Sequence, residues 1–270
     1  MKISSINFNK YVAKTPNFKA YHTENEQDYN NNPQGRLCHT SMFFRYPKKD
    51  EKVVEILKNI FPNQKLKIIS QGCSQGEEVY SIAMLLKKSN IEADLVGVDI
   101  DDNIIYKARK GAYELDFNEF LAFINPSGNQ KYAALFDEYF VPNRSSVLYP
   151  HATGKFYKKK KDKFQNCKFL QGDILNCDKQ FPKNSVNAIF CRNILYHLLD
   201  FEDENYNEKV CDDVIKKMKM NLVNNGIIIF APSEIFSFSH AIEKALIAND
   251  FRCLDNDTKT IWQKTDYLSK

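Results

Sequence analysis

The stretch QGCSQGEEVYS, at Gln71–Ser81, decides the fold. It follows a short apolar segment, LKIIS (Leu66–Ser70), and leads into a segment with apolar residues at helical spacing, Glu77–Lys88. Gly72 and Gly76 lack a Cβ, so the backbone between strand and helix can turn tightly and approach a ligand. The stretch therefore predicts a strand, a glycine turn that faces a ligand, and a helix.

The same alternation continues on both sides of this unit. A helix is predicted upstream at Lys49–Ile60, and ADLVGVD (Ala93–Asp99) predicts a second strand. The remaining predicted elements are helices at Asp102–Arg109, Asn207–Leu222 and Ser239–Ala248, and strands within Cys167–Ile174, Val186–Asn193, Gly226–Ala231, Phe251–Leu254 and Thr260–Lys264. Strands alternating with helices indicate an α/β fold, a Rossmann-like parallel sheet with helices on both faces.

Two regions depart from this alternation. Residues 1–38, which include the asparagine-rich tract DYNNNPQG, are predicted to be a poorly ordered arm. Residues 39–270 then form one domain, interrupted by an insert at about residues 114–166 that is predicted to be a small subdomain. The insert contains four consecutive lysines, Lys158–Lys161, which are either a docking site for an acidic peptide or a solvated charged loop.

The composition excludes several classes of protein. The chain has 270 residues, 43% of them hydrophobic, and a net charge of only +4, which does not single out nucleic acid or membrane as a partner. Apolar runs such as GIIIFA are far shorter than the roughly 20 residues of a membrane helix. Seven cysteines without a C-x-x-C pair indicate reduced thiols in the cytoplasm and no metal site, with Cys73 and Cys191 as buried hydrophobic residues.

The polar residues of the glycine turn indicate which ligand it suits. Glu77 and Glu78 follow the turn directly and would repel the pyrophosphate of a dinucleotide, whereas a carboxylate there suits a ligand with an ammonium group. Asp99 ends the next strand, where an acidic residue accepts hydrogen bonds from ribose hydroxyls. These features favour S-adenosylmethionine over NAD. The alternatives are two glutamates in an ordinary first helical turn and a solvated aspartate at a strand end.

Six motifs in order carry a family resemblance. They are TSMFFR (Thr40–Arg45), GCSQGEEVYSIAMLL (Gly72–Leu86), GVDID (Gly97–Asp101), KARKGAYE (Lys107–Glu114), AIFCRNIL (Ala188–Leu195) and PSEIFS (Pro232–Ser237). Together they resemble the CheR-type methyltransferases, which methylate glutamates of chemotaxis receptors. The resemblance implies a class I methyltransferase sheet, S-adenosylmethionine as cofactor and S-adenosylhomocysteine as product.

The resemblance also implies a set of site residues. Arg45, Arg192 and His197 are the predicted catalytic residues, and either arginine is expected to orient an incoming carboxylate through paired hydrogen bonds. The predicted cofactor pocket consists of Ser41, Arg45, Gly72, Glu77, Asp99, Asp173, Ile174, Arg192 and Asn193. The family usually has threonine at position 41 and asparagine at position 173, and both replacements keep a hydrogen-bonding side chain.

The chain departs from the family in two places. The family reads R-N-x-x-I-Y-F, but RNILYHL (Arg192–Leu198) has His197 at the tyrosine position and Tyr196 one residue earlier. His197 either replaces the tyrosine or only packs. The family also has a small helical domain before the methyltransferase part, which is expected here to be absent or reduced to the arm.

Three functions follow from these patterns. The first is methylation of a protein glutamate, on a receptor-like or another protein, and a glutamate carboxylate with a pKa of about 4.3 needs no general base at neutral pH. The second is methylation of RNA or a small molecule through the same cofactor pocket. The third is a non-catalytic adaptor that binds the cofactor, with His197 as the mark of lost activity.

Overall fold

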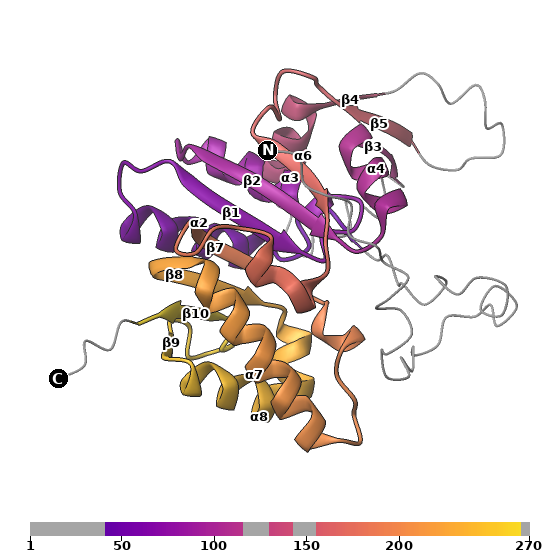
Figure 1. Ribbon diagram of the computed structural model, residues 1–270. Coiled ribbons are helices and arrows are strands. Elements are labelled where there is room, and N and C mark those ends of the chain that lie inside the picture. Colours follow the sequence, from indigo (N-terminus) through magenta and orange to yellow (C-terminus); the bar gives the residue numbers. More distant parts are fainter. Residues whose placement is uncertain (1–40, 116–129, 143–154, 266–270) are drawn as a thin grey trace, which may run out of the picture.

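The computed structural model describes residues 41–115, 130–142 and 155–265 (Figure 1). The predicted arm, residues 1–38, lies outside the described residues, as do residues 116–129 and 143–154 of the predicted insert. At the centre is a seven-stranded sheet in the order β6-β2-β1-β7-β8-β10-β9. Its strands are β1 Leu66–Gln71, β2 Ala93–Asp99, β6 Cys167–Gln171, β7 Val186–Cys191, β8 Leu222–Phe230, β9 Phe251–Cys253 and β10 Ile261–Lys264.

The first five strands of this order are parallel. β1 pairs in parallel with β2 and β7, β2 with β6, and β7 with β8, whereas β10 is antiparallel to both β8 and β9. Parallel neighbours need a crossover connection, and here helices supply it. The predicted α/β class, with a mostly parallel sheet, is confirmed.

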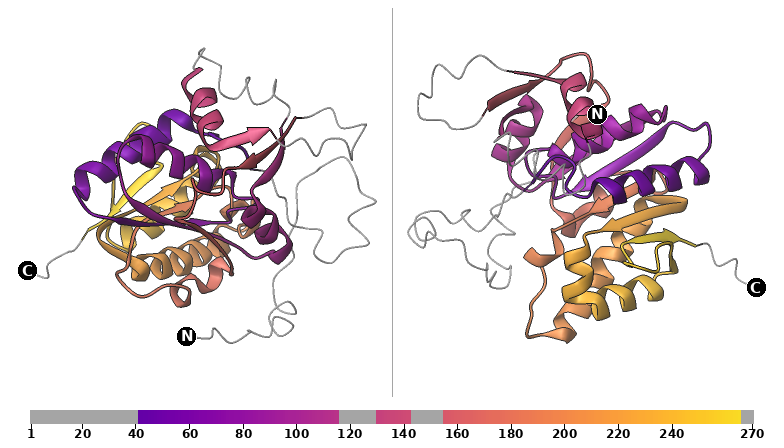
Figure 2. Two further views of the ribbon diagram at one scale, coloured as in Figure 1. Left: turned by 90° about the horizontal axis from the view of Figure 1, so that it is seen from above. Right: turned by 180° about the vertical axis from the view of Figure 1, so that it is seen from behind.

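Helices cover both faces of the sheet (Figure 2). On one face lie α2 Pro47–Ile60, α3 Glu77–Lys88 and α4 Asp102–Lys110, and on the other lie α7 Glu204–Asn221, α8 Pro232–Ala248 and the short 3-10 helix η4 Ile174–Lys179. Successive residues of a strand point to opposite faces, so each central strand feeds both cores. Ile68 packs in the α2–α3 core and Ile69 in the α7–α8 core, which explains why these strands are continuously apolar.

The helix ends agree with their capping residues, with one correction. Asp101 caps α4, its side chain accepting a hydrogen bond from the backbone N–H of Asn103, and Gly111 ends the helix in the left-handed region with φ 57°. The last helix is predicted to begin at Ser239. α8 spans Pro232–Ala248, but Phe238 has non-helical angles (φ −131°, ψ 29°), so the predicted helix matches the segment after this kink, and a further helical segment from Pro232 precedes it. Proline is well suited to the first helical turn, which explains why the additional segment begins at Pro232.

The segment between α4 and β6 forms a small antiparallel sheet in the order β3-β5-β4, with α6 beside it. The elements are β3 Ala112–Leu115, α6 Gln130–Tyr139, β4 Phe140–Pro142 and β5 Lys155–Lys159. Phe43, from the segment before α2, makes edge-to-face contacts with Tyr113, Phe136 and Phe140 at 4.9–5.2 Å. The small sheet is thereby packed onto the α2–α3 face by an aromatic cluster. The division of the chain into arm, domain and insert stays a prediction.

None of the helices among the described residues combines the length and the apolarity that crossing a membrane requires.

Candidate functional site

The predicted cofactor residues are brought together at one edge of the sheet. Gly72 follows β1, Asp99 ends β2, Asp173 lies just after β6, and Asn193 lies just after β7. These four strands are parallel neighbours, so their carboxyl ends meet at the same edge. The helix after β1 covers one face and the helix after β7 covers the other. This reversal is the switch point where open α/β sheets bind ligands.

The turn between β1 and α3 has a conformation that only certain residues adopt. Gly72, Ser74 and Gly76 have positive φ angles of 65°, 49° and 92°. A Cβ on Gly72 would lie 2.6 Å from Cδ1 of Ile194, in the loop after β7. The absence of a side chain at Gly72 therefore serves two purposes: it permits the left-handed backbone, and it lets the two loops touch.

Asp99 is buried, and its carboxylate accepts hydrogen bonds that stabilise the turn. Its Oδ2 accepts a hydrogen bond from the backbone N–H of Ser74 at 2.9 Å, and its Oδ1 accepts one from the N–H of Asp101 at 3.1 Å. The Asp99 carbonyl accepts a third from the N–H of Gly172, after β6, at 2.9 Å. A carboxylate offers about four acceptor positions, so both oxygens retain capacity for ligand hydroxyls.

Glu77, the first residue of α3, is a buried carboxyl group beside this turn. Burial raises its pKa to about 7, and hydrogen bonds from its own backbone and from Ser41 oppose that shift. Its Oε2 atom is buried and finds no hydrogen-bond partner among the described residues. An unpaired carboxylate oxygen in such a place is costly unless a positively charged ligand group reaches it. Glu77 therefore suits the ammonium group of S-adenosylmethionine.

Asp173 is the N-cap of η4 and Ile174 is its first residue, just after β6. The Asp173 side chain accepts a hydrogen bond from the backbone N–H of Leu175 at 2.9 Å. The backbone carbonyl of Asp173 accepts another from Nε2 of Gln180 at 2.7 Å. Ile174 is buried and packs in the α7–α8 core. Asp173 thus acts as a helix cap in the described structure, while its predicted contact with the cofactor stays a prediction.

Arg192 lies in a buried ion-pair network. One of its guanidinium nitrogens is 2.6 Å from Oδ1 of Asp50 in α2, another is 3.5 Å from Oε2 of Glu78, and its side chain is 2% exposed. The rings of Tyr46 and Phe190 lie 5.3 and 4.8 Å from its guanidinium carbon. Burial raises the pKa of Asp50 to about 6, against the opposing effect of the Arg192 charge. The arginine joins α2, α3 and β7, a role that the motifs did not predict.

The other two predicted catalytic residues are half-buried. Arg45 lies two residues before α2, with its guanidinium carbon 5.7 Å from the Tyr46 ring. His197 ends the 3-10 helix η5 Leu195–His197, and its neighbour Tyr196 shares a hydrogen bond with the Ser237 hydroxyl at 2.6 Å. The tyrosine hydroxyl is thereby directed toward α8. The replacement of the family tyrosine by His197 stays a prediction.

Glu234, in the first turn of α8, escaped the sequence analysis. It is fully buried, and its Oε1 accepts a hydrogen bond from the backbone N–H of Leu195 at 2.7 Å. A glutamate two residues after a helix-starting proline was the available signal, but that pattern predicts only a bond to its own helix start. The pairing of Asp50 and Glu78 with Arg192 was also missed, because the arginine is more than a hundred residues away from both.

The cysteines and the potential metal ligands do not contribute to this edge as reactive groups. Cys73 and Cys191 are buried, and burial raises the pKa of both thiols well above the usual value, the opposite of what a nucleophile needs. Among the described residues, Glu204, Glu208 and His240 lie close enough to share an ion. The Glu208 carboxylate is already 2.6 Å from the Lys244 ammonium, so that cluster is a surface ion pair.

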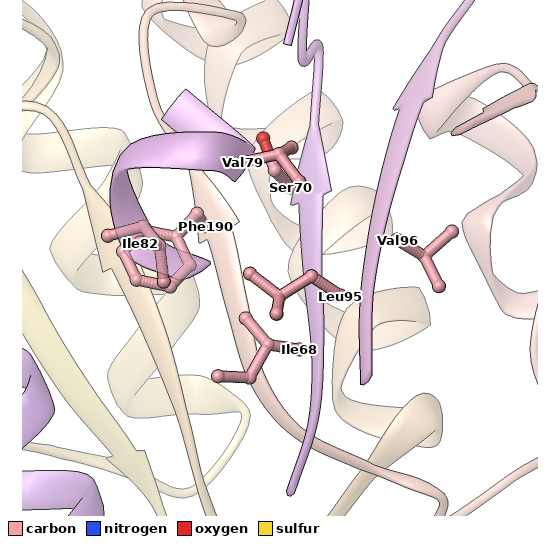
Figure 3. Close-up of a pocket in the computed structure, with 7 residues that line it drawn as sticks. All are labelled: Ile68, Ser70, Val79, Ile82, Leu95, Val96 and Phe190. Atoms are coloured by element: carbon pink, nitrogen blue, oxygen red, sulfur yellow. The ribbon is translucent and has the colours of Figure 1, made fainter. Parts of the chain in front are cut away.

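Among the described residues, hollows are also found away from this edge. The first, of about 10 Å³, lies between β1, β2, β7 and α3 and is almost entirely apolar (Figure 3). Its volume admits one water molecule at most, so it is a packing defect of the core. The second, of about 380 Å³, is lined by lysines near the amino end of β7, away from the edge that carries Gly72 and Asp99. Its Lys264 ammonium donates to the Leu222 carbonyl and its Lys219 pairs with Asp250.

Comparison with solved structures finds methyltransferases. One is a putative S-adenosyl-L-methionine-dependent methyltransferase from Methanococcus maripaludis, at 11% identity and a TM-score of 0.44, covering 83% of this chain and 89% of that one. Another is the magnesium protoporphyrin IX methyltransferase from Synechocystis, at 15% identity and a TM-score of 0.43, covering 82% and 81%.

Curated relatives are more similar in sequence. A chemotaxis protein methyltransferase from Borreliella burgdorferi is 26% identical over 200 residues, and chemotaxis protein methyltransferase 2 from Vibrio cholerae is 30% identical over 204 residues. The alignments cover 70% and 72% of this chain but only 57% and 62% of those proteins. The family model described as CheR methyltransferase, SAM-binding domain, matches residues 39–250. The chain therefore belongs to the CheR methyltransferase family, and the matched part is its S-adenosylmethionine-binding domain.

Proposed function

We propose that this chain transfers a methyl group from S-adenosylmethionine to the side-chain carboxylate of a protein glutamate, on a chemoreceptor-like substrate in the cytoplasm. The observation that carries the proposal is the family match over residues 39–250. Two relatives named as chemotaxis protein methyltransferases support it. RNA, a small molecule or no acceptor at all are the competing outcomes of the test below.

The residues at the carboxyl edge of the sheet fit the cofactor. Glu77 offers a buried, unpaired carboxylate oxygen to the ammonium group. Asp99 offers the remaining acceptor positions of its carboxylate to the ribose hydroxyls. The glycine turn brings backbone close to both, and the half-buried Ser41, Asp173 and Asn193 complete the predicted lining. All of these are proposed contacts, supported by the common location of the residues.

The chemistry asks little of the protein beyond orientation. Bound S-adenosylmethionine would supply a methyl group on a positively charged sulfur. A carboxylate oxygen would bond to the methyl carbon as the carbon–sulfur bond breaks, and the products would be a methyl ester and S-adenosylhomocysteine. A glutamate carboxylate is already an anion at neutral pH, so no proton has to be removed. The protein has to hold the attacking oxygen in line with the methyl group and keep water away.

Of the two predicted arginines, Arg45 is better suited to orient that carboxylate. The Arg192 guanidinium is engaged by Asp50 and has a 2% exposed side chain, so turning it toward a substrate would leave a buried carboxylate without its partner. Arg45 lies half-buried beside α2, on the same segment as Ser41. We therefore assign the orienting role to Arg45 and the structural role to Arg192.

The test follows the bond that is formed. The protein is incubated with methyl-labelled cofactor and a chemoreceptor fragment or cell extract, and the labelled product is treated with mild alkali. A glutamate methyl ester hydrolyses and releases volatile methanol, whereas N-methyl and ether groups keep the label. Arg45→Ala should slow transfer about 100-fold while changing cofactor affinity less, because misplacing the attacking group costs about that much.

Arg252→Ala is the matched control, because that guanidinium contacts Gln263 of β10 and should leave transfer unchanged. Base-stable label would contradict the proposal and favour an RNA or small-molecule acceptor, which nuclease treatment of the product distinguishes. Tight cofactor binding without transfer to any acceptor would favour the adaptor.

A further inference from the structure

Glu234 in α8 is a buried carboxylate that accepts a backbone hydrogen bond from the loop after β7. Its Oε1 accepts a hydrogen bond from the N–H of Leu195 at 2.7 Å, and its Oε2 accepts one from the N–H of Ala231 at 3.2 Å. The backbone N–H groups of Asn193 and Ile194 also lower the pKa of this carboxyl group. The Leu195 hydrogen bond therefore joins the loop after β7 to a side chain in α8, and the N–H groups of the two preceding residues favour the ionised form of that side chain.

This loop is one wall of the candidate site. Asn193 has a φ of 56°, in the left-handed region that asparagine tolerates better than most residues. Ile194 lies close to Gly72, because a Cβ added to Gly72 would be 2.6 Å from Cδ1 of Ile194. The position of the loop thus decides how closely it approaches the glycine turn.

Further contacts from the start of α8 reach the same loop. The Ser233 hydroxyl donates to Oδ1 of Asn193 at 3.1 Å, and the Tyr196 hydroxyl donates to the Ser233 carbonyl at 2.9 Å. The beginning of α8 therefore orients both the backbone and the side chains of the loop. Glu234 is the central group of this set because it is fully buried and binds the backbone.

We propose that Glu234 is a positioning residue, which shapes the loop Asn193–Leu195 so that it closes the cofactor site against the turn at Gly72 without itself touching the cofactor. The proposal rests on the proposed function, because it concerns the same cofactor site. Burial raises the pKa of Glu234 to about 7, while the loop N–H groups favour its ionised form. The titratable groups that face it, Cys191 on β7 and Cys211 on α7, carry thiols whose pKa is raised by burial, so they stay neutral beside it.

The test compares Glu234→Gln with Glu234→Asp in the full chain. Glutamine removes the charge and turns an N–H₂ group toward backbone donors, so about tenfold weaker binding of S-adenosylhomocysteine by calorimetry is expected. Aspartate keeps the charge and should recover part of that affinity. Amide hydrogen exchange, measured without cofactor, should speed up at Asn193–Leu195 in the glutamine variant and stay slow in the middle of α8.

Glu243→Gln is the matched control, because it removes from the same helix a carboxylate that forms a surface ion pair with the exposed Lys259. It should change neither affinity nor exchange. Faster exchange at the loop with unchanged cofactor affinity would overturn the inference, since the loop would then be held for stability alone. If Glu234→Gln fails to fold, Glu234→Asp and Ser233→Ala carry the same comparison, and unchanged affinity in both would also overturn it. A wild-type protein that binds no adenosyl ligand would instead overturn the proposed function, whatever the exchange data.

Discussion

The turn after β1 and the loop after β7 touch at the carboxyl edge of the sheet, yet different interactions hold them. The turn is shaped mainly by its own glycines, since Gly72 and Gly76 adopt positive φ angles, and by Asp99 at the end of the adjacent strand β2, which binds the Ser74 N–H. The loop after β7 is shaped from a distance, by Glu234 of α8 on its backbone and by Asp50 of α2 on Arg192. The two halves of one site therefore differ in how far their sequence reveals them.

The largest expected effect is on the free energy of unfolding, when the Asp50–Arg192 ion pair at the end of β7 is broken. Asp50→Ala should lower the free energy of unfolding by about 3–5 kcal/mol, because it leaves the Arg192 charge buried without its main partner. Urea denaturation at pH 8, where Asp50 is ionised in the wild type, measures it. Glu51→Ala is the control: its ion pair with Lys131 is about a third exposed and should contribute about 1 kcal/mol at most. Equal losses in both variants would show that the buried pair is not an anchor.

The next effect is on the turn after β1. Asp99→Ala should weaken cofactor binding about 100-fold, about 2.7 kcal/mol, because ribose hydroxyls lose their acceptor and the Ser74 N–H loses its partner. The measurement is calorimetry with S-adenosylhomocysteine. Asp94→Ala, an exposed aspartate on the same strand that pairs with Lys65, should leave affinity unchanged. Full affinity in Asp99→Ala would remove Asp99 from the site.

A third prediction concerns the contact between the two halves. Gly72→Ala should cost about 1–2 kcal/mol for the left-handed backbone alone, and more because its Cβ would meet Ile194. Ile194→Val removes the nearest carbon, Cδ1, so the double variant should recover the part of the loss due to the clash. A double-mutant cycle by thermal unfolding should give a coupling above about 0.5 kcal/mol. Strict additivity would mean that the loops do not touch.

The smallest expected effect is a dependence of cofactor affinity on pH. Burial raises the pKa of Glu77 to about 7, so the carboxyl is mostly neutral at pH 6 and mostly ionised at pH 8. Only the ionised form attracts an ammonium group, and affinity should therefore rise about tenfold over this range. Calorimetry at several pH values measures the rise, which Glu77→Gln should flatten.

The free protein should show the opposite trend. A carboxyl group whose pKa is raised by folding contributes stability that is present below its unfolded pKa of 4.5 and is lost as pH rises through about 7. The difference in Tm between wild type and Glu77→Gln isolates this contribution from Asp50 and Glu234, which titrate in the same range. A difference that does not change with pH would contradict the assigned pKa.

The insert illustrates where pattern alone left two alternatives. The sequence predicts that the run Lys158–Lys161 is either a docking site or a solvated loop. In the structure, two of the four lysines contact other parts of the chain and two are exposed. Lys159 donates to the Tyr80 hydroxyl at 2.8 Å, and Lys160 donates to the carbonyls of Asp137 and Glu138. Lys158 and Lys161 are exposed. A run of like charges does not indicate which members pack, because that depends on the elements they meet.

The sequence by itself determined the α/β class, the parallel strands, the glycine turn and the position of Asp99, because alternating apolar periods, glycines and strand-end carboxylates act through near neighbours. It also carried the family, through six motifs in order. Only the tertiary structure decided that Arg192 pairs with Asp50 and that Glu234 binds the backbone of the β7 loop. These contacts join residues about forty or more positions apart, and charged side chains buried in pairs follow no sequence period. Their partners exist only once α2 and α8 have packed against opposite faces of the sheet.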